Sequence, residues 1–184
     1  MTGTDFNALI ERIAKGDKSA FELFYRTMEK PLFRFVQSKL NDPFQSADIL
    51  HDVFLEVWRG AARFEGRSSV RTWVFGIAYR KIMDVFRKDA RTTVTDLLPD
   101  REDESPDVVQ CLIATQDRAL VQDCLGKLSP DHRSAIELTF FEDMSYREIS
   151  AVMDVPEGTV KSRVFHAKML LMRCLEGRMK KGVE

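Results

Sequence analysis

The sequence predicts an all-α protein made of two small helical domains joined by a flexible linker. Apolar residues recur with the helical period along residues 1–95, an acidic segment with prolines interrupts the pattern at 96–116, and residues 117–184 resume it. The last part also carries the pattern of a helix-turn-helix. At 184 residues, 44% hydrophobic and 31% charged, the chain is long enough to bury two such cores.

The first two helices are expected before residue 41. Apolar residues keep helical spacing from Phe6 to Ile13, and again from Ser19 to Leu40, where Pro31 predicts a kink. Both segments are interpreted as core-forming helices.

The third helix is predicted from Ser46, as its N-cap, to Phe64. Its expected buried row consists of Ile49, Val53 and Val57. Three further apolar side chains, Phe54, Leu55 and Trp58, fall outside that row and lie beside acidic residues. The helix therefore either lies deep in the bundle or offers a mixed apolar and acidic patch to a partner, and the pattern leaves both possibilities open.

A basic segment with interleaved aromatics follows at 63–91, opening with a glycine-containing loop. Its rings are Phe64, Trp73, Phe75, Tyr79 and Phe86. Basic side chains can follow phosphates while rings stack on unpaired bases, so the segment indicates a groove for single-stranded nucleic acid. Trp73 shares a helical face with Ile77 and is expected to be largely buried.

The net charge of −1 conceals a strong segregation of charge. Residues 61–91 carry eight basic against three acidic residues, and 156–184 carry seven against three, whereas 92–123 carry two against eight. Two basic blocks separated by an acidic one favour two surfaces for a polyanion.

The C-terminal domain is predicted to contain four helices. Ser129-Pro130 is a typical helix start, and Ser145 with Glu148 forms a capping box at the start of the next helix. The residues from Asp154 to Pro156 then end that helix.

The helix after this break has one buried face and one face of hydrogen-bond donors. The expected buried stripe is Val160, Val164, Ala167 and Leu171. The donors are Thr159, Lys161, Ser162, Arg163 and His166. They suit phosphates and base edges at the first turns of a recognition helix, while an ordinary amphipathic hairpin with a solvated polar face is the alternative.

The cysteines and the ends of the chain exclude several classes of protein. Cys111, Cys124 and Cys174 form no C-x-x-C pair, so we expect reduced, mostly buried thiols, with no disulfide framework, metal site or cofactor. No apolar run reaches about 18 residues, and the first residues have no signal-peptide pattern. The expected location is the cytoplasm, without direct membrane insertion.

Three motifs in this order resemble the extracytoplasmic function (ECF) group of bacterial RNA polymerase sigma factors. They are DILHDVFLEVW at 48–58, FEGRSSVRTWVFGIA at 64–78, and LSPDHRSAIELTFFEDMSYREISAVMDVPEGTVKSRVFHAKMLL at 128–171. The resemblance implies a sigma-2-like domain at 1–95, an acidic linker at 96–116 and a sigma-4-like domain at 117–184. It also implies transcription initiation for a stress or envelope regulon, and no enzymatic activity.

The resemblance implies several partners and a set of residues for each. The clamp helices of the largest subunit of core RNA polymerase would contact Asp48, His51, Asp52, Leu55 and Trp58. The minus-10 element of promoter DNA would contact Phe64, Glu65, Gly66, Arg67, Ser68, Arg80 and Lys81. The minus-35 element would contact the donor face named above, and the flap of the second-largest subunit is a further partner. An anti-sigma factor is expected to restrain the protein, and such a factor could hold it at the membrane.

Four positions depart from the family pattern. His51 stands where Gln is usual, Arg80 where Asn is frequent, and His166 where Arg is common. Asp154 replaces the usual Gly of the turn, which Asp can do because it tolerates a left-handed backbone. The promoter sequence therefore does not follow from the resemblance.

Two other classes of protein fit the sequence less well. A stand-alone helix-turn-helix regulator would leave the aromatics of 63–91 unexplained. An enzyme is disfavoured because no nucleophile and base pair, glycine-rich phosphate loop or metal-ligand spacing occurs.

Overall fold

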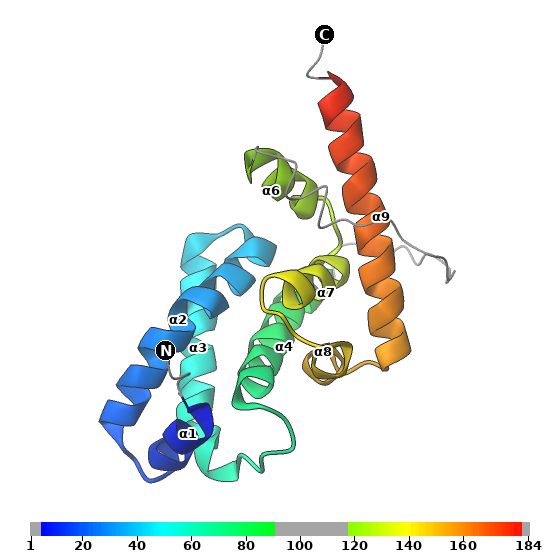
Figure 1. Ribbon diagram of the computed structural model, residues 1–184. Coiled ribbons are helices and arrows are strands. Elements are labelled where there is room, and N and C mark those ends of the chain that lie inside the picture. The colour runs from blue at the N-terminus through cyan, green and yellow to red at the C-terminus, as the bar shows by residue number, and fades with distance from the viewer. Residues whose placement is uncertain (1–4, 91–117, 182–184) are drawn as a thin grey trace. The chain divides into compact units, whose positions relative to one another are not determined.

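The computed structural model describes residues 5–90 and 118–181, where all regular structure is helical (Figure 1). The chain divides into two compact units. The first contains α1 (Phe6–Ala14), α2 (Lys18–Leu40), α3 (Pro43–Gly60), the 3₁₀ turn η1 (Ala61–Arg63) and α4 (Val70–Ala90). The second contains α6 (Arg118–Gly126), α7 (Pro130–Phe140), the first part of α8 (Tyr146–Met153) and α9 (Glu157–Lys181). The all-α prediction is confirmed, and the predicted linker lies outside the described residues.

Aspartate side chains begin the first three helices. Asp5, Asp17 and Asp42 each accept hydrogen bonds from two backbone N–H groups of the following turn. The third helix therefore starts at Pro43, and the prediction of Ser46 as its N-cap was wrong. Proline needs no N–H at the first helical position, and Ser46 instead lies buried, donating to the Asp42 carbonyl at 2.6 Å.

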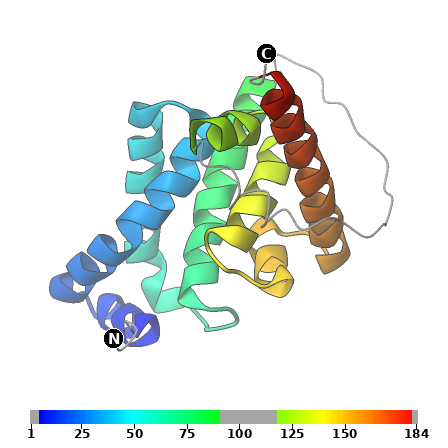
Figure 2. The same cartoon turned by 45° about the horizontal axis from the view of Figure 1, so that its top comes forward.

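In the first unit α2 packs against α1 and α3, and α3 packs against α4 (Figures 1 and 2). Phe54, expected outside the buried row of α3, is only 2% exposed and contacts the rings of Phe21, Phe24 and Tyr25. Of the two possibilities left open for Phe54, the structure shows the buried one, because α3 has neighbours on several sides and buries more than one row. Ile49, expected in that row, is partly exposed.

In the second unit α9 packs along both α6 and α7. The core cluster consists of Cys124, Leu125, Leu128, Ile136, Ala167, Leu171 and Leu175. The predicted stripe of α9 is buried throughout: Val160, Val164, Ala167 and Leu171 are at most 1% exposed. Local sequence periodicity was sufficient to identify this face.

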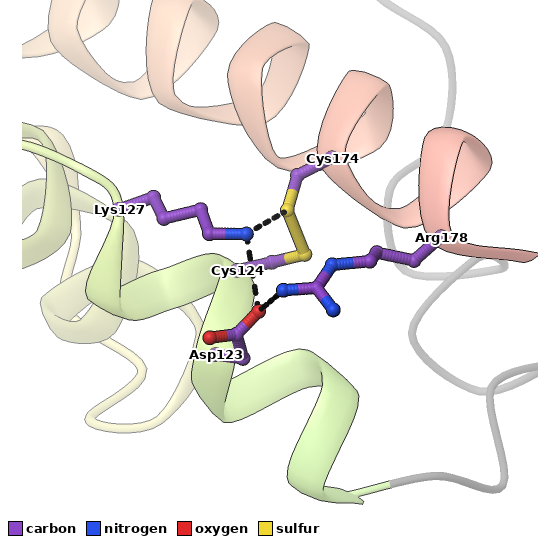
Figure 3. The surroundings of a disulfide bond; sticks show 5 residues. All are labelled: Asp123, Cys124, Lys127, Cys174 and Arg178. Carbon is purple, nitrogen blue, oxygen red and sulfur yellow. Dashed lines mark hydrogen bonds and ion pairs between the residues drawn. A yellow bond between two sulfur atoms is a disulfide. The ribbon is translucent and has the colours of Figure 1, made fainter. Parts of the chain in front are cut away.

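A disulfide joins α6 to α9 at the edge of that core, where the partly buried Cys174 packs against the cluster that contains Cys124 (Figure 3). Cys124 and Cys174 are 50 residues apart in sequence, and helix packing brings their Cα atoms to 5.8 Å. The expectation of reduced thiols was therefore wrong, because sequence spacing does not reveal which helices pack together. Beside the disulfide, Asp123 pairs with Lys127 at 3.1 Å and with Arg178, while Lys127 Nζ lies 3.8 Å from Cys174 Sγ. Cys111 lies outside the described residues.

Candidate nucleic-acid and polymerase interfaces

Local hydrogen bonds build the helix-turn-helix as predicted. Ser145 N–H donates to Glu148 Oε2 at 2.9 Å, and Glu148 N–H donates back to Ser145 Oγ at 3.3 Å, which is a complete capping box. Asp154 adopts φ 53°, the left-handed conformation expected of it. Ser150 Oγ then donates to the Val155 carbonyl at 2.6 Å and closes the turn before α9.

The five predicted donors of α9 are all at least partly accessible. Lys161 is exposed, and the partly exposed members are Thr159, Ser162, Arg163 and His166. Ser162 Oγ donates to the Gly158 carbonyl at 3.1 Å, which leaves its oxygen able to accept a further bond. Phe165, absent from the predicted set, is also partly exposed, with its ring centroid 5.6 Å from that of His166.

The start of α7 packs against this part of α9 through two contacts that periodicity could not reveal. Arg163 Nη2 pairs with Asp131 Oδ2 at 2.7 Å, and the rings of His132 and His166 meet edge to face at 6.2 Å. Burial lowers the pKa of His132, and the His166 ring and the Arg163 guanidinium lower it further, against an opposing effect of Asp131. His132 therefore favours its neutral form, with Nδ1 3.0 Å from Ser129 Oγ.

The predicted polymerase-binding residues follow one another along α3. Asp48, His51 and Asp52 are exposed, and Leu55 and Trp58 are partly exposed. The Trp58 ring packs edge to face against the Phe21 ring, with the two ring centroids 5.1 Å apart. The arrangement offers three polar side chains and two apolar ones to a partner, without the buried Phe54.

The loop before α4 carries five of the predicted minus-10 residues. Glu65, Gly66 and Arg67 are exposed, Phe64 and Ser68 are partly exposed, and Gly66 has φ 69°, a conformation that favours glycine. An ion pair joins Arg67 to Glu65. Ser69 ends the loop by accepting a bond from Thr72 N–H at 3.0 Å.

An aromatic pair lies at this loop. The Phe64 ring is 4.9 Å from that of Trp73 and tilted by 38°. Trp73 is partly exposed, so the expectation of a largely buried ring was too strong, although Ile77 on the same face is 1% exposed. A Cβ atom at Gly60 would lie 3.3 Å from Trp73, so the end of α3 supports this ring closely. Phe75 and Tyr79 belong to the core.

Arg80 and Lys81 lie further along α4, and both pair with Glu56 of α3. Glu56 Oε2 is 3.0 Å from Lys81 Nζ, and its Oε1 is 3.7 Å from Arg80 Nη2. The side chains of Arg80 and Lys81 are 56% and 24% exposed, so they reach solvent while remaining tied to α3. The sequence shows Glu56 among the acidic residues of this helix but did not predict its two cationic partners, because they depend on how α3 packs on α4.

Comparison with known proteins places this arrangement in a family. Residues 24–92 match Sigma-70 region 2, and residues 118–177 match Sigma-70, region 4. The chain is 30% identical to the ECF RNA polymerase sigma factor SigK of Mycobacterium tuberculosis (strain H37Rv), over 94% of this chain and 95% of that protein. The chain is an ECF RNA polymerase sigma factor. SigK of Mycobacterium sp. (strain JLS) is 28% identical, over 94% of this sigma factor and 91% of the relative.

Two solved structures share the fold of this sigma factor. One is CnrH in complex with the cytosolic domain of CnrY, with a TM-score of 0.69, 23% identity, and coverage of 93% of this chain and 97% of that one. The other is the sigma factor RpoE in complex with the anti-sigma factor NepR from Bartonella quintana, with a TM-score of 0.66, 23% identity, and coverage of 85% and 96%. Family membership identifies the chain as a transcription initiation factor that uses region 2 and region 4 elements.

Neither a membrane-spanning helix nor a metal-binding cluster occurs among the described residues. None of the helices in 5–90 and 118–181 combines the length and the apolar character needed to cross a bilayer. Over the same ranges, no three His, Cys, Asp or Glu side chains gather in a group that could hold a metal ion.

Proposed function

We propose that this sigma factor binds core RNA polymerase with its N-terminal domain and reads promoters with one DNA surface in each domain. The domains are 1–95 and 117–184, joined by the acidic linker 96–116. The observation that carries the proposal is the order of the two sigma-70 matches, region 2 over the unit with the aromatic loop and region 4 over the unit with the helix-turn-helix. A stand-alone regulator is not favoured, since it needs no region 2.

Polymerase binding is assigned to the exposed side of α3. Asp48 and Asp52 supply negative charge for basic side chains on the clamp helices of the largest subunit, while Leu55 and Trp58 supply apolar area. The exposed His51 borders both groups. The flap of the second-largest subunit is the proposed partner of the C-terminal domain.

Capture of the minus-10 element is assigned to the loop before α4 and to the two cations behind it. The exposed backbone at Gly66 and the partly exposed ring of Phe64 can receive an unstacked base, while Glu65, Arg67 and Ser68 offer polar groups beside it. Arg80 and Lys81 can neutralise phosphates of the same strand. Melting follows because a held base returns the few kcal/mol lost on unstacking.

Recognition of the minus-35 duplex is assigned to the first turns of α9. Lys161 and Thr159 suit phosphates, Arg163 and His166 can offer donors to base edges, and Ser162 can offer an acceptor. The N-terminal residues of a recognition helix are the ones that usually enter the major groove. On these assignments, α9 determines which minus-35 sequence the sigma factor recognises.

Regulation by an anti-sigma factor is part of the proposal. Both structural neighbours were solved with a partner, the cytosolic domain of CnrY and the anti-sigma factor NepR. We expect a comparable partner to clamp the two domains and to cover the partly exposed Leu55 and Trp58. The sigma factor would then act in the cytoplasm on a stress or envelope regulon without enzymatic activity of its own, and a membrane-bound partner could hold it there.

The decisive experiment is run-off transcription of fragmented genomic DNA from the source organism, with core RNA polymerase and the purified chain. We expect discrete start sites that share two upstream elements and that are lost when either component is omitted. Addition of the candidate anti-sigma factor should abolish them. Tight, sequence-specific duplex binding by the chain alone, together with no transcription when core enzyme is added, would support the stand-alone regulator instead.

A further inference from the structure

The recognition helix does not present Arg163 alone. The guanidinium is drawn toward α7, where its Nη2 pairs with Asp131 at 2.7 Å, and the Arg163 side chain is only 22% exposed. One turn further along α9, the His166 ring rests against His132, the residue that follows Asp131. The first turn of α7 therefore contacts two of the α9 side chains that are proposed to read the minus-35 element, Arg163 and His166.

The start of α7 is itself held firmly. Ser129 accepts a bond from His132 N–H at 3.3 Å, and its hydroxyl also lies 3.0 Å from His132 Nδ1. Pro130 occupies the first helical position, which limits the backbone further. Asp131 therefore presents its carboxylate from a rigid turn, as a fixed support for a long and otherwise flexible side chain.

The guanidinium is not fully satisfied in this arrangement. Arg163 Nη1 is buried and finds no hydrogen-bond partner among the described residues. An unpaired buried donor is costly, so this nitrogen adds nothing that DNA can reach directly. Because Nη1 is shielded from solvent, DNA meets the exposed part of the side chain, 22% of it, whose orientation the ion pair with Asp131 sets.

From these contacts we infer that Asp131 is a positioning residue for minus-35 recognition, which holds Arg163 in the orientation that reads the promoter. The inference rests on the proposed function. Arginine has many rotamers, and fixing it before DNA arrives removes much of the entropy cost of the contact. The discrimination between the correct and the wrong base should therefore depend on a side chain of α7.

The change in DNA binding when Asp131 is removed distinguishes a positioning role from simple repulsion of phosphates. Asp131 is a negative charge near a surface for a polyanion, so removing it should strengthen binding to any duplex if it only repels phosphates. A positioning role predicts a loss of discrimination instead. Partly exposed ion pairs add little to folding stability, so the fold should survive the change.

The test uses holoenzyme, assembled from core polymerase and the full chain, on a promoter identified by the run-off experiment and on a copy with a scrambled minus-35 element. The ratio of the two affinities is measured for Asp131→Asn. We expect this ratio to fall about fivefold or more, the lower end of the cost of a lost base contact, while affinity for the scrambled copy is unchanged or higher. Because one protein preparation binds both templates, any unfolded fraction cancels from the ratio.

Two comparisons make the test specific to Arg163. Asp123→Asn removes a similar carboxylate, 48% exposed and paired with Arg178 of α9, and should leave the ratio unchanged. In an Arg163→Ala background, Asp131→Asn should cause no further loss, since the residue it acts through is gone. An unchanged ratio for Asp131→Asn, an equal gain for both templates, or the same loss in both backgrounds would overturn the inference. A parent holoenzyme that does not distinguish the two templates would instead refute the proposed minus-35 function.

Discussion

Cys124 and Cys174 are bonded across α6 and α9, and the Lys127 ammonium lies 3.8 Å from the Cys174 sulfur. Cys124 is 1% exposed and belongs to the core cluster of the second unit. The bond closes a loop with a sequence separation of 50 residues, so it restricts the unfolded chain considerably. The stability of the second unit should therefore depend on the redox state of this pair, of which Cys124 is buried and Cys174 partly exposed.

Reduction of this disulfide, or the double substitution of Cys124→Ser and Cys174→Ser, is expected to lower the free energy of unfolding by about 2 to 4 kcal/mol. Urea unfolding of the oxidised protein, with and without dithiothreitol, measures the difference. Cys111→Ser serves as the control and should leave the response to dithiothreitol unchanged. An oxidised parent that unfolds at the same urea concentration as the reduced one would rule out a stabilising role.

The stability of the second unit is expected to fall as the pH drops below the ordinary range of histidine. Burial and the nearby His166 and Arg163 lower the pKa of His132 in the folded state, so the unfolded chain takes up a proton first as the pH falls. The stabilising effect of the neutral His132 ring is therefore complete at pH values above the pKa of this residue in the unfolded chain. It is lost as the pH falls toward the lower pKa of the folded state. In thermal unfolding experiments, the melting temperature of His132→Gln should fall less between pH 7.5 and pH 5.5 than that of the parent.

Phe54 and Trp58, four residues apart on α3, are expected to respond differently to truncation. Phe54→Ala should destabilise the first unit by about 3 to 5 kcal/mol, because it removes a ring that is 2% exposed and surrounded by other rings. Trp58→Ala should cost less stability and should weaken binding to core polymerase, since its ring is partly exposed. Thermal melts and core pull-downs of both variants measure this contrast, and equal effects on both readouts would contradict it.

Asp52→Arg is expected to abolish association with core polymerase while leaving the helical content unchanged. The substitution reverses an exposed charge on a surface proposed to meet basic clamp helices, and like charges across an interface are strongly unfavourable. Glu11→Arg, a similar reversal at an exposed position of α1, is the matched control and should bind core as the parent does. Retention of core by the Asp52 variant would move the interface away from α3.

The features that the sequence alone predicted correctly are those that depend on residues close together in the chain. The capping box of Ser145 and Glu148, the helix start at Ser129 and the left-handed Asp154 all depend on groups a few residues apart, and each is present in the structure. The buried stripe of α9 is likewise a local matter of spacing. The all-α class followed from the same period, because a helix buries a face that its own sequence already marks.

Only the tertiary structure decided which helices meet and therefore which long-range pairs form. The disulfide of Cys124, the ion pairs of Glu56 with α4 and the contact of Asp131 with Arg163 all join different helices. Periodicity shows that a helix has a buried face but not which neighbour covers it, so it left the burial of Phe54 open and predicted too deep a position for Trp73. The physical reason is that packing energy depends on the shapes of both partners, whereas capping and spacing depend on one stretch of chain.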